Sequence, residues 1–218
     1  MEKKLDIKKL FNLASKNLQK NNFQEAINIY NEILKIEPSH LQSIFFLGSL
    51  LVQLKKFDLA KPLLQKAIQI DPNFSAAHNN LGLLFFKLAE NEKAISCYEK
   101  SIQIDPKYKE PLKNLGILFH KSGEREKAIS CYEKAIQIDP NYGEVYLNLG
   151  MILGELGENT KALDNFKKAL NFDIVKKKTL VEYGNLLLKL NEHLNGLRFI
   201  NKGEGVIKFK QLNFEIVE

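Results

Sequence analysis

The sequence contains no tryptophan, only two cysteines, and it has no long hydrophobic run. Its longest segment of apolar and small residues, 44–52, is followed by Gln53 and is far shorter than the roughly 20 residues that a membrane-spanning helix needs. Near the start, Asp6, Lys8 and Lys9 interrupt the stretch that would have to be apolar in a signal peptide. We therefore expect a cytoplasmic protein with no membrane partner.

A broad basic surface is also lacking. The net charge is +6, but most of the excess lies in residues 1–9 and in the run Lys176, Lys177 and Lys178. Proteins that bind nucleic acid neutralise many successive phosphates. We therefore expect no nucleic-acid partner.

What the chain does contain is an internal repeat. Residues 92–106, EKAISCYEKSIQIDP, return at residues 126–140 as EKAISCYEKAIQIDP, 34 residues later. Prolines mark the same period along the chain, and they fix six successive windows. With Pro38, Pro72, Pro106 and Pro140 at position 32, the windows are 7–40, 41–74, 75–108, 109–142, 143–176 and 177–210.

Equivalent positions of the windows share their residue types. Positions 8 and 20 are small, positions 7 and 24 are large and mostly apolar, and position 15 holds residues that tolerate a left-handed turn in four of six windows. We predict two helices per window, joined by a turn at position 15, with the two small residues facing each other so that the helices approach closely. The small residues are Ala14, Gly48, Gly82, Gly116, Gly150 and Gly184 at position 8, and Ala26, Ala60, Ala94, Ala128, Ala162 and Gly196 at position 20.

The order Leu115-Gly116, Ala128, Tyr132 and Pro140 resembles the tetratricopeptide repeat of 34 residues. This resemblance implies an all-α fold, a right-handed superhelical solenoid of about six helix-turn-helix repeats over residues 1–203. The last repeat departs from the pattern and is predicted to be degenerate. We interpret residues 204–218 as a short non-helical tail packed on the last repeat, or as the stub of a linker.

The resemblance also implies that the first helix of each repeat lines a concave face, through positions 2, 5, 6, 9, 12 and 13, which we call the inner positions. Position 6 is asparagine in four repeats, Asn12, Asn80, Asn114 and Asn148. An asparagine amide donates and accepts hydrogen bonds, so it can pair with a peptide backbone whatever the ligand's side chains. The arrangement is similar to the asparagine ladder in the superhelical repeats of O-GlcNAc transferase. The alternative is that duplication copied ordinary surface residues.

Four asparagines contribute only a few kcal/mol at about 0.5–1.5 kcal/mol for each hydrogen bond, whereas micromolar binding requires about 8 kcal/mol. Apolar residues must supply the rest. Candidates at inner positions are Phe45, Phe46 and Met151, and His120 also points inward. The alternative for the apolar candidates is core packing between neighbouring first helices.

No pattern in the sequence indicates catalysis. Cys97 and Cys131 follow the repeat period without metal-site spacing, and the four histidines occupy unrelated positions. We expect no catalytic residue, metal or cofactor. The sequence favours a protein-interaction module that binds an extended peptide or partner segment in its concave groove. Two alternatives stay open: the substrate-recruiting part of a transferase or oxygenase whose catalytic domain lies elsewhere, and a scaffold that self-associates.

Overall fold

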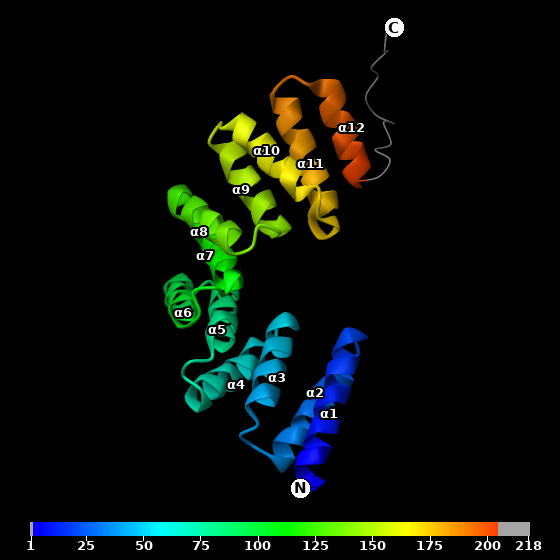
Figure 1. Cartoon of the computed structure of the whole chain (residues 1–218), viewed down its shortest axis with the longest axis vertical. Helices are drawn as coiled ribbons and strands as arrows, with labels where there is room; N and C mark the ends of the chain where they lie inside the picture. The colour runs from blue at the N-terminus through cyan, green and yellow to red at the C-terminus, as the bar shows by residue number, and fades with distance from the viewer. Residues whose placement is uncertain (1, 205–218) are drawn as a thin grey trace. The chain divides into compact units, whose positions relative to one another are not determined.

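A computed structural model describes residues 2–204. Of the predicted non-helical tail at 204–218, only Glu204 is among them, and it is the last residue of a helix, so the tail prediction is wrong at this residue; the rest of the tail lies outside the described residues. Within the described residues the chain forms twelve helices and no strand, which confirms the predicted all-α fold of helix-turn-helix repeats (Figure 1). The helices are α1 (Glu2–Gln19), α2 (Phe23–Ile36), α3 (Leu41–Gln53), α4 (Phe57–Ile70), α5 (Ser75–Lys87), α6 (Asn91–Ile104), α7 (Lys109–Lys121), α8 (Arg125–Ile138), α9 (Gly143–Glu155), α10 (Asn159–Ala169), α11 (Asp173–Lys189) and α12 (His193–Glu204).

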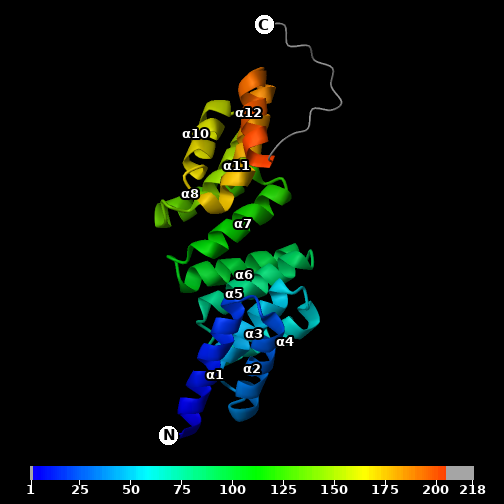
Figure 2. The same ribbon diagram turned by 90° about the vertical axis from the view of Figure 1, so that its right-hand side faces the viewer.

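The contacts of the chain divide it into two compact units, Met1–Leu118 (unit 1) and Phe119–Glu218 (unit 2), with the boundary inside α7. In unit 1, α1 packs on α2, α3 on α4, and α5 on α6; in unit 2, α9 packs on α10 and α11 on α12. Figure 2 shows the same helices from a second direction.

The turn inside each helix pair lies at the predicted position. The residue at position 15 has a positive φ in every repeat, and this left-handed conformation reverses the chain between the two helices. The six residues are Asn21, Lys55, Ala89, Gly123, Gly157 and Asn191, with φ from 59° to 81°. The turn prediction is confirmed, including at Lys55 and Ala89, whose side chains disfavour the conformation.

Aspartate and proline form the corner between repeats. The Oδ1 atom of Asp71 accepts the backbone N–H of Asn73 at 3.0 Å, and Asp105 accepts the N–H of Lys107 at 3.0 Å. Such a turn, with the chain held extended at the aspartate, ends the second helix and directs the chain into the next repeat.

Where the proline is absent, the helix that follows is longer. Ile174 stands at the proline position of the fifth repeat, and α11 begins at Asp173, so it has 17 residues where α9 has 13. Proline disfavours the helical conformation of the residue before it. With isoleucine in its place, α11 extends backward by one turn, and Ile174 is 82% exposed.

The glycines at position 8 make room for the large side chains at position 24 as well as for the facing helix. A Cβ atom added at Gly82 would lie 2.8 Å from the Tyr98 ring, and one at Gly150 would lie 2.7 Å from the Phe166 ring. In these pairs the glycine makes room for the large side chain at position 24. Small residues also face each other as predicted: a Cβ on Gly150 would lie 3.2 Å from the Ala162 carbonyl oxygen, and one on Gly184 would lie 2.7 Å from the Gly196 carbonyl oxygen. The rings therefore fill the core, with Tyr98 fully buried and Phe166 2% exposed.

Candidate functional site

A chain of hydrogen-bonded side chains links three first helices of unit 1. The Asn114 Nδ2 on α7 donates to Asn79 Oδ1 on α5 at 3.0 Å, and Asn79 Nδ2 donates to Asn80 Oδ1 at 3.2 Å. Asn80 Nδ2 donates to Ser49 Oγ on α3 at 2.6 Å, and Ser49 donates to the Phe45 carbonyl at 2.7 Å. We call Asn114, Asn79, Asn80 and Ser49 the amide chain. Two predicted ladder residues, Asn80 and Asn114, are thus joined through a residue that is not at a ladder position.

Asn79 is the centre of the amide chain. Its side chain is 4% exposed, and its amide also lies 3.4 Å from the Tyr108 hydroxyl. A buried amide without partners would lower the stability of the fold, and here Asn114, Asn80 and Tyr108 supply those partners. The network therefore holds the Asn80 amide in one orientation.

The position of Asn80 leaves part of its amide available. An asparagine amide has two N–H donors and an oxygen with two lone pairs. Within the described part of the chain, Asn79 and Ser49 use one donor and one lone pair. One N–H and one lone pair of a half-buried side chain remain to meet a ligand.

A groove of about 580 Å³ lies between α3 and α5 beside this amide. Six of its eight lining residues stand at inner positions, and the other two, Lys55 and Phe57, belong to the α3–α4 turn and the start of α4. The wall combines apolar, amide, hydroxyl and ammonium groups. We call this hollow the α3–α5 groove: Ser49, Val52, Gln53, Lys55, Phe57, Asn80, Leu83 and Lys87.

The predicted phenylalanines form a cluster with one another. The Phe45 ring lies 5.3 Å from Phe46 and 4.6 Å from Phe74, between ring centroids, and Phe46 lies 5.6 Å from Phe11. Such tilted and edge-on pairs stabilise the packing of neighbouring helices. Phe46 is nevertheless 39% exposed, so it packs and also offers an apolar surface.

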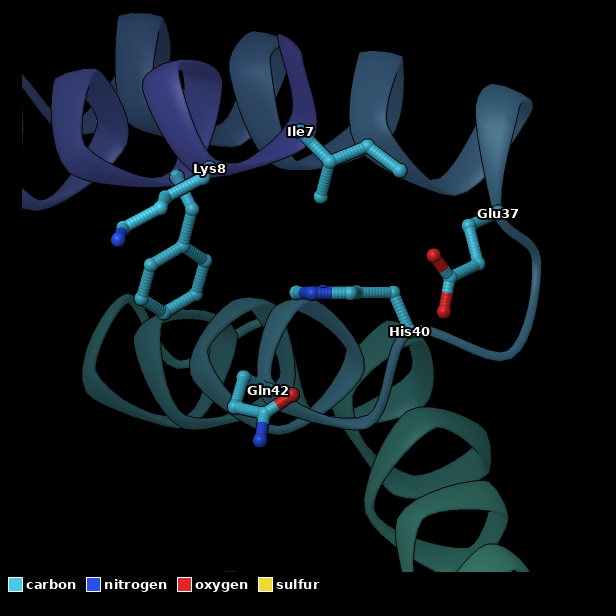
Figure 3. Close-up of a pocket in the computed structure, with 6 residues that line it drawn as sticks. Ile7, Lys8, Glu37, His40 and Gln42 are labelled. Carbon is cyan, nitrogen blue, oxygen red and sulfur yellow. The ribbon is translucent and has the colours of Figure 1, made fainter. Parts of the chain in front are cut away.

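A second hollow of unit 1, of about 470 Å³, lies where α1 meets the start of α3. Figure 3 shows Ile7 pointing from α1 into it and the Glu37 carboxylate turned toward it beside His40. His40 has a structural task, because its Nδ1 accepts the Ser43 backbone N–H at 3.3 Å and so caps α3.

In unit 2, His120 binds a carboxylate of its own chain. Its Nε2 lies 3.0 Å and 3.1 Å from the two oxygens of Glu155, and the Arg125 Nε lies 3.4 Å from one of them. Partial burial raises the pKa of Glu155, but the hydrogen bonds and charges of His120 and Arg125 outweigh it, and the net pKa is lowered. His120 therefore positions Glu155 and is itself partly occupied.

Met151 lines a small hollow of about 130 Å³ in unit 2, together with Glu155, Glu182 and Phe166. Gly154, a glycine inside α9, contributes to its wall, and an added Cβ there would lie 3.7 Å from the nearest Leu186 carbon. Asn148 is half-buried on α9, and Asn12 is exposed on α1. The eight predicted site residues thus fall into the amide chain, the aromatic cluster, the unit 2 ion pair and hollow, and two separate asparagines.

The sequence pattern did not single out Asn79, Ser49, Lys55 and Lys87. The adjacent asparagines Asn79 and Asn80 were a signal, since they place amides at two neighbouring inner positions. Which of the two is buried depends on how α5 is rotated about its own axis, and in the structure Asn79 is the buried one.

The duplicated cysteine and tyrosine are packing residues. Burial raises the pKa of Cys97 to about 11, and it raises the pKa of the neighbouring Tyr98 as well. Neither group is ionised near neutral pH, so the thiol lacks the thiolate character of a nucleophile.

Among residues 2–204, no three His, Cys, Asp or Glu side chains are grouped as they would be around a metal ion. No helix in this part of the chain has the length and apolar character needed to cross a membrane.

Comparison with known proteins identifies the repeats. Family models described as tetratricopeptide repeats match residues 17–84, 75–108 and 143–173, and one described as a TPR repeat matches residues 116–157. A search of curated proteins finds no match.

Solved structures agree in fold. The crystal structure of MamA is 29% identical, with a TM-score of 0.62 over 76% of this chain and 96% of that one. PilF of Pseudomonas aeruginosa is 18% identical, with a TM-score of 0.80 over 91% of this chain and 90% of that one. YrrB, described as a TPR protein with an unusual peptide-binding site, is 17% identical, with a TM-score of 0.60 over 80% and 90% of the two chains. The chain belongs to the tetratricopeptide-repeat family.

Proposed function

We propose that the chain is a non-catalytic protein-interaction module that holds an extended peptide or partner segment against its first helices. The observation that carries the proposal is the position of Asn80, which belongs both to the amide chain and to the α3–α5 groove. A ligand in the groove meets an amide whose orientation is already fixed, so little side-chain freedom is lost on binding.

The chemistry of the groove suits a peptide backbone. The remaining N–H of Asn80 can donate to a ligand carbonyl, and the remaining lone pair can accept a ligand N–H. Because these contacts ignore the side chains of the ligand, they favour an extended segment without requiring one sequence. The ladder amides at Asn114, Asn148 and Asn12 stay proposed contacts of the same kind.

Apolar contacts supply most of the affinity. Leu83 and Val52 line the α3–α5 groove, and burying a leucine side chain of a ligand against them contributes about 1.5–3 kcal/mol. Phe46, with its exposed edge, extends the apolar surface next to α1. The similar structure of YrrB, described as having a peptide-binding site, supports a peptide as the ligand class.

The test is the binding of capped, extended heptapeptides of mixed sequence, measured by fluorescence polarisation on the full chain. The groove variant Gln53→Ala/Leu83→Ala is compared with Leu59→Ala/Gln65→Ala, which makes the same two changes on α4 outside the groove; Leu59 is 60% exposed. We expect the groove variant to bind roughly tenfold more weakly, a loss of about 1.4 kcal/mol, and the α4 variant to bind like the wild type.

Circular dichroism must show equal helicity for both variants. Equal affinity of the groove variant and the wild type, or loss of binding in the α4 variant alone, would contradict the proposal.

A further inference from the structure

The charges around the α3–α5 groove are of one sign. Lys55 and Lys87 line it, and no carboxylate is among its lining residues. From this we propose that the groove selects extended peptide segments that carry an aspartate or glutamate side chain, bound by the two ammonium groups next to Asn80. This inference rests on the proposed function and names the chemistry of its ligand.

The negative ends of the helix dipoles offset only part of the positive charge of the two lysines. Lys87 is in the last turn of α5, and Lys55 follows the end of α3. Each helix C-terminus carries roughly half a negative charge, so the two ends together offset about one of the two positive charges. A net positive charge of about one remains at the groove.

The acidic residues that follow these two lysines in the chain do not line the groove. Asp58 lies in the first turn of α4 and does not line the groove. Glu90, in the turn after α5, forms an ion pair with Lys93, which holds the pKa of this carboxyl below its usual range.

Lys55 occupies an unfavourable backbone position. Its φ is 59°, and this left-handed conformation costs an ordinary residue about 1 kcal/mol relative to glycine. The same conformation occurs at position 15 of every repeat, so it belongs to the turn between the two helices. Here it brings the lysine from the turn to the edge of the groove.

The corresponding hollow of unit 2 has a different charge pattern. It is also lined from inner positions, but Glu155 and Glu182 face it together with Lys189. First helices can therefore place carboxylates in such a hollow, and the α3–α5 groove differs in having none among its lining residues.

In the α3–α5 groove the lysines stand at positions 13 and 15, which places the charge at the end of the helices. Because the proposed Asn80 contacts engage a peptide unit of the ligand backbone, we expect the acidic group to be an internal side chain and not a terminal carboxylate.

The test uses three acetylated and amidated heptapeptides of leucine and alanine with a central Glu, Gln or Lys, and a fourth with central Gln and a free C-terminus. Binding to the full chain is measured by fluorescence polarisation at low and high salt. We expect the Glu peptide to bind about three- to tenfold more tightly than its Gln counterpart, as two exposed ion pairs allow, and this preference to fall as salt is added.

Two sets of variants assign the effect to the groove. Lys55→Gln/Lys87→Gln should abolish the preference for Glu, and Lys55→Glu/Lys87→Glu should shift the preference to the Lys peptide. The control Lys35→Gln/Lys107→Gln removes the same charge from exposed lysines of unit 1 outside the groove and should keep the preference for Glu.

The outcomes separate this inference from the proposed function. Equal binding of the Glu and Gln peptides, a preference that survives in Lys55→Gln/Lys87→Gln, or preference only for the free C-terminus overturns the inference while peptide binding itself stands. Failure of every peptide to bind overturns both.

Discussion

At the scale of single residues, Asn79 supports the groove without lining it. It connects Asn114 to Asn80 from a nearly buried position. Its contribution is therefore to stability and to the orientation of Asn80.

We predict that Asn79→Ala lowers the free energy of unfolding by about 1–3 kcal/mol, because it removes hydrogen-bond partners from the half-buried Asn80 and Asn114 amides. Asn148→Ala makes the same chemical change at a ladder position outside the amide chain and should change stability by less than about 0.5 kcal/mol. Urea denaturation of the full chain, followed by circular dichroism, measures both. Equal losses in the two variants would show that the amide chain does not contribute specifically.

The period of the sequence predicted which residue types line the first helices, but not how they pair. Asn80 and Asn114 were found from the repeat, because position 6 recurs every 34 residues. Asn79 was not, since its burial follows from the packing of α5 against its neighbours and from the Tyr108 hydroxyl within reach. Likewise, His120 was placed on the inner face, but its pairing with Glu155 depends on a residue 35 positions away.

At the scale of helices and turns, the left-handed turn is the feature that every repeat shares. It was predictable where the residue is glycine or asparagine. At Ala89 the residue gives no such signal, yet φ is 60°, because the packed α5 and α6 on either side impose the reversal. The longer α11 follows from Ile174 in place of proline, and its extra turn was not predicted.

We predict that Ala89→Gly raises the free energy of unfolding by about 0.5–1 kcal/mol, since glycine adopts a positive φ without steric penalty. Gly123→Ala should lower it by about 1 kcal/mol. Apart from the glycine and its chain neighbours, no atom of the described residues lies within 4 Å of the added Cβ, so this variant tests the backbone conformation.

The measurement is thermal and urea unfolding of the two variants beside the wild type. A loss of stability in Ala89→Gly would mean that the alanine methyl group contributes packing that outweighs the conformational gain.

At the scale of the whole molecule, the contacts that stabilise the fold join neighbouring helices. The main contacts in each unit join helices that are next to each other, or next but one, in the chain. In such a repeat protein, free energy is approximately a sum of repeat and nearest-neighbour contributions. A ligand held by two first helices therefore stabilises those helices most.

We predict that the Glu heptapeptide, at about 100 times its dissociation constant, slows amide hydrogen exchange in α3 and α5 by up to about 100-fold. At this concentration, binding stabilises the folded form of these helices by about 2.7 kcal/mol relative to the open form that exchanges. The amides of α11 and α12 should change little. Exchange followed by mass spectrometry on the full chain resolves the helices.

In Lys55→Gln/Lys87→Gln, under the same peptide concentration, protection of α3 and α5 should be several-fold smaller. Uniform slowing over all helices would instead mean that the chain opens as one cooperative unit, and slowing confined to α11 and α12 would place the ligand outside the α3–α5 groove.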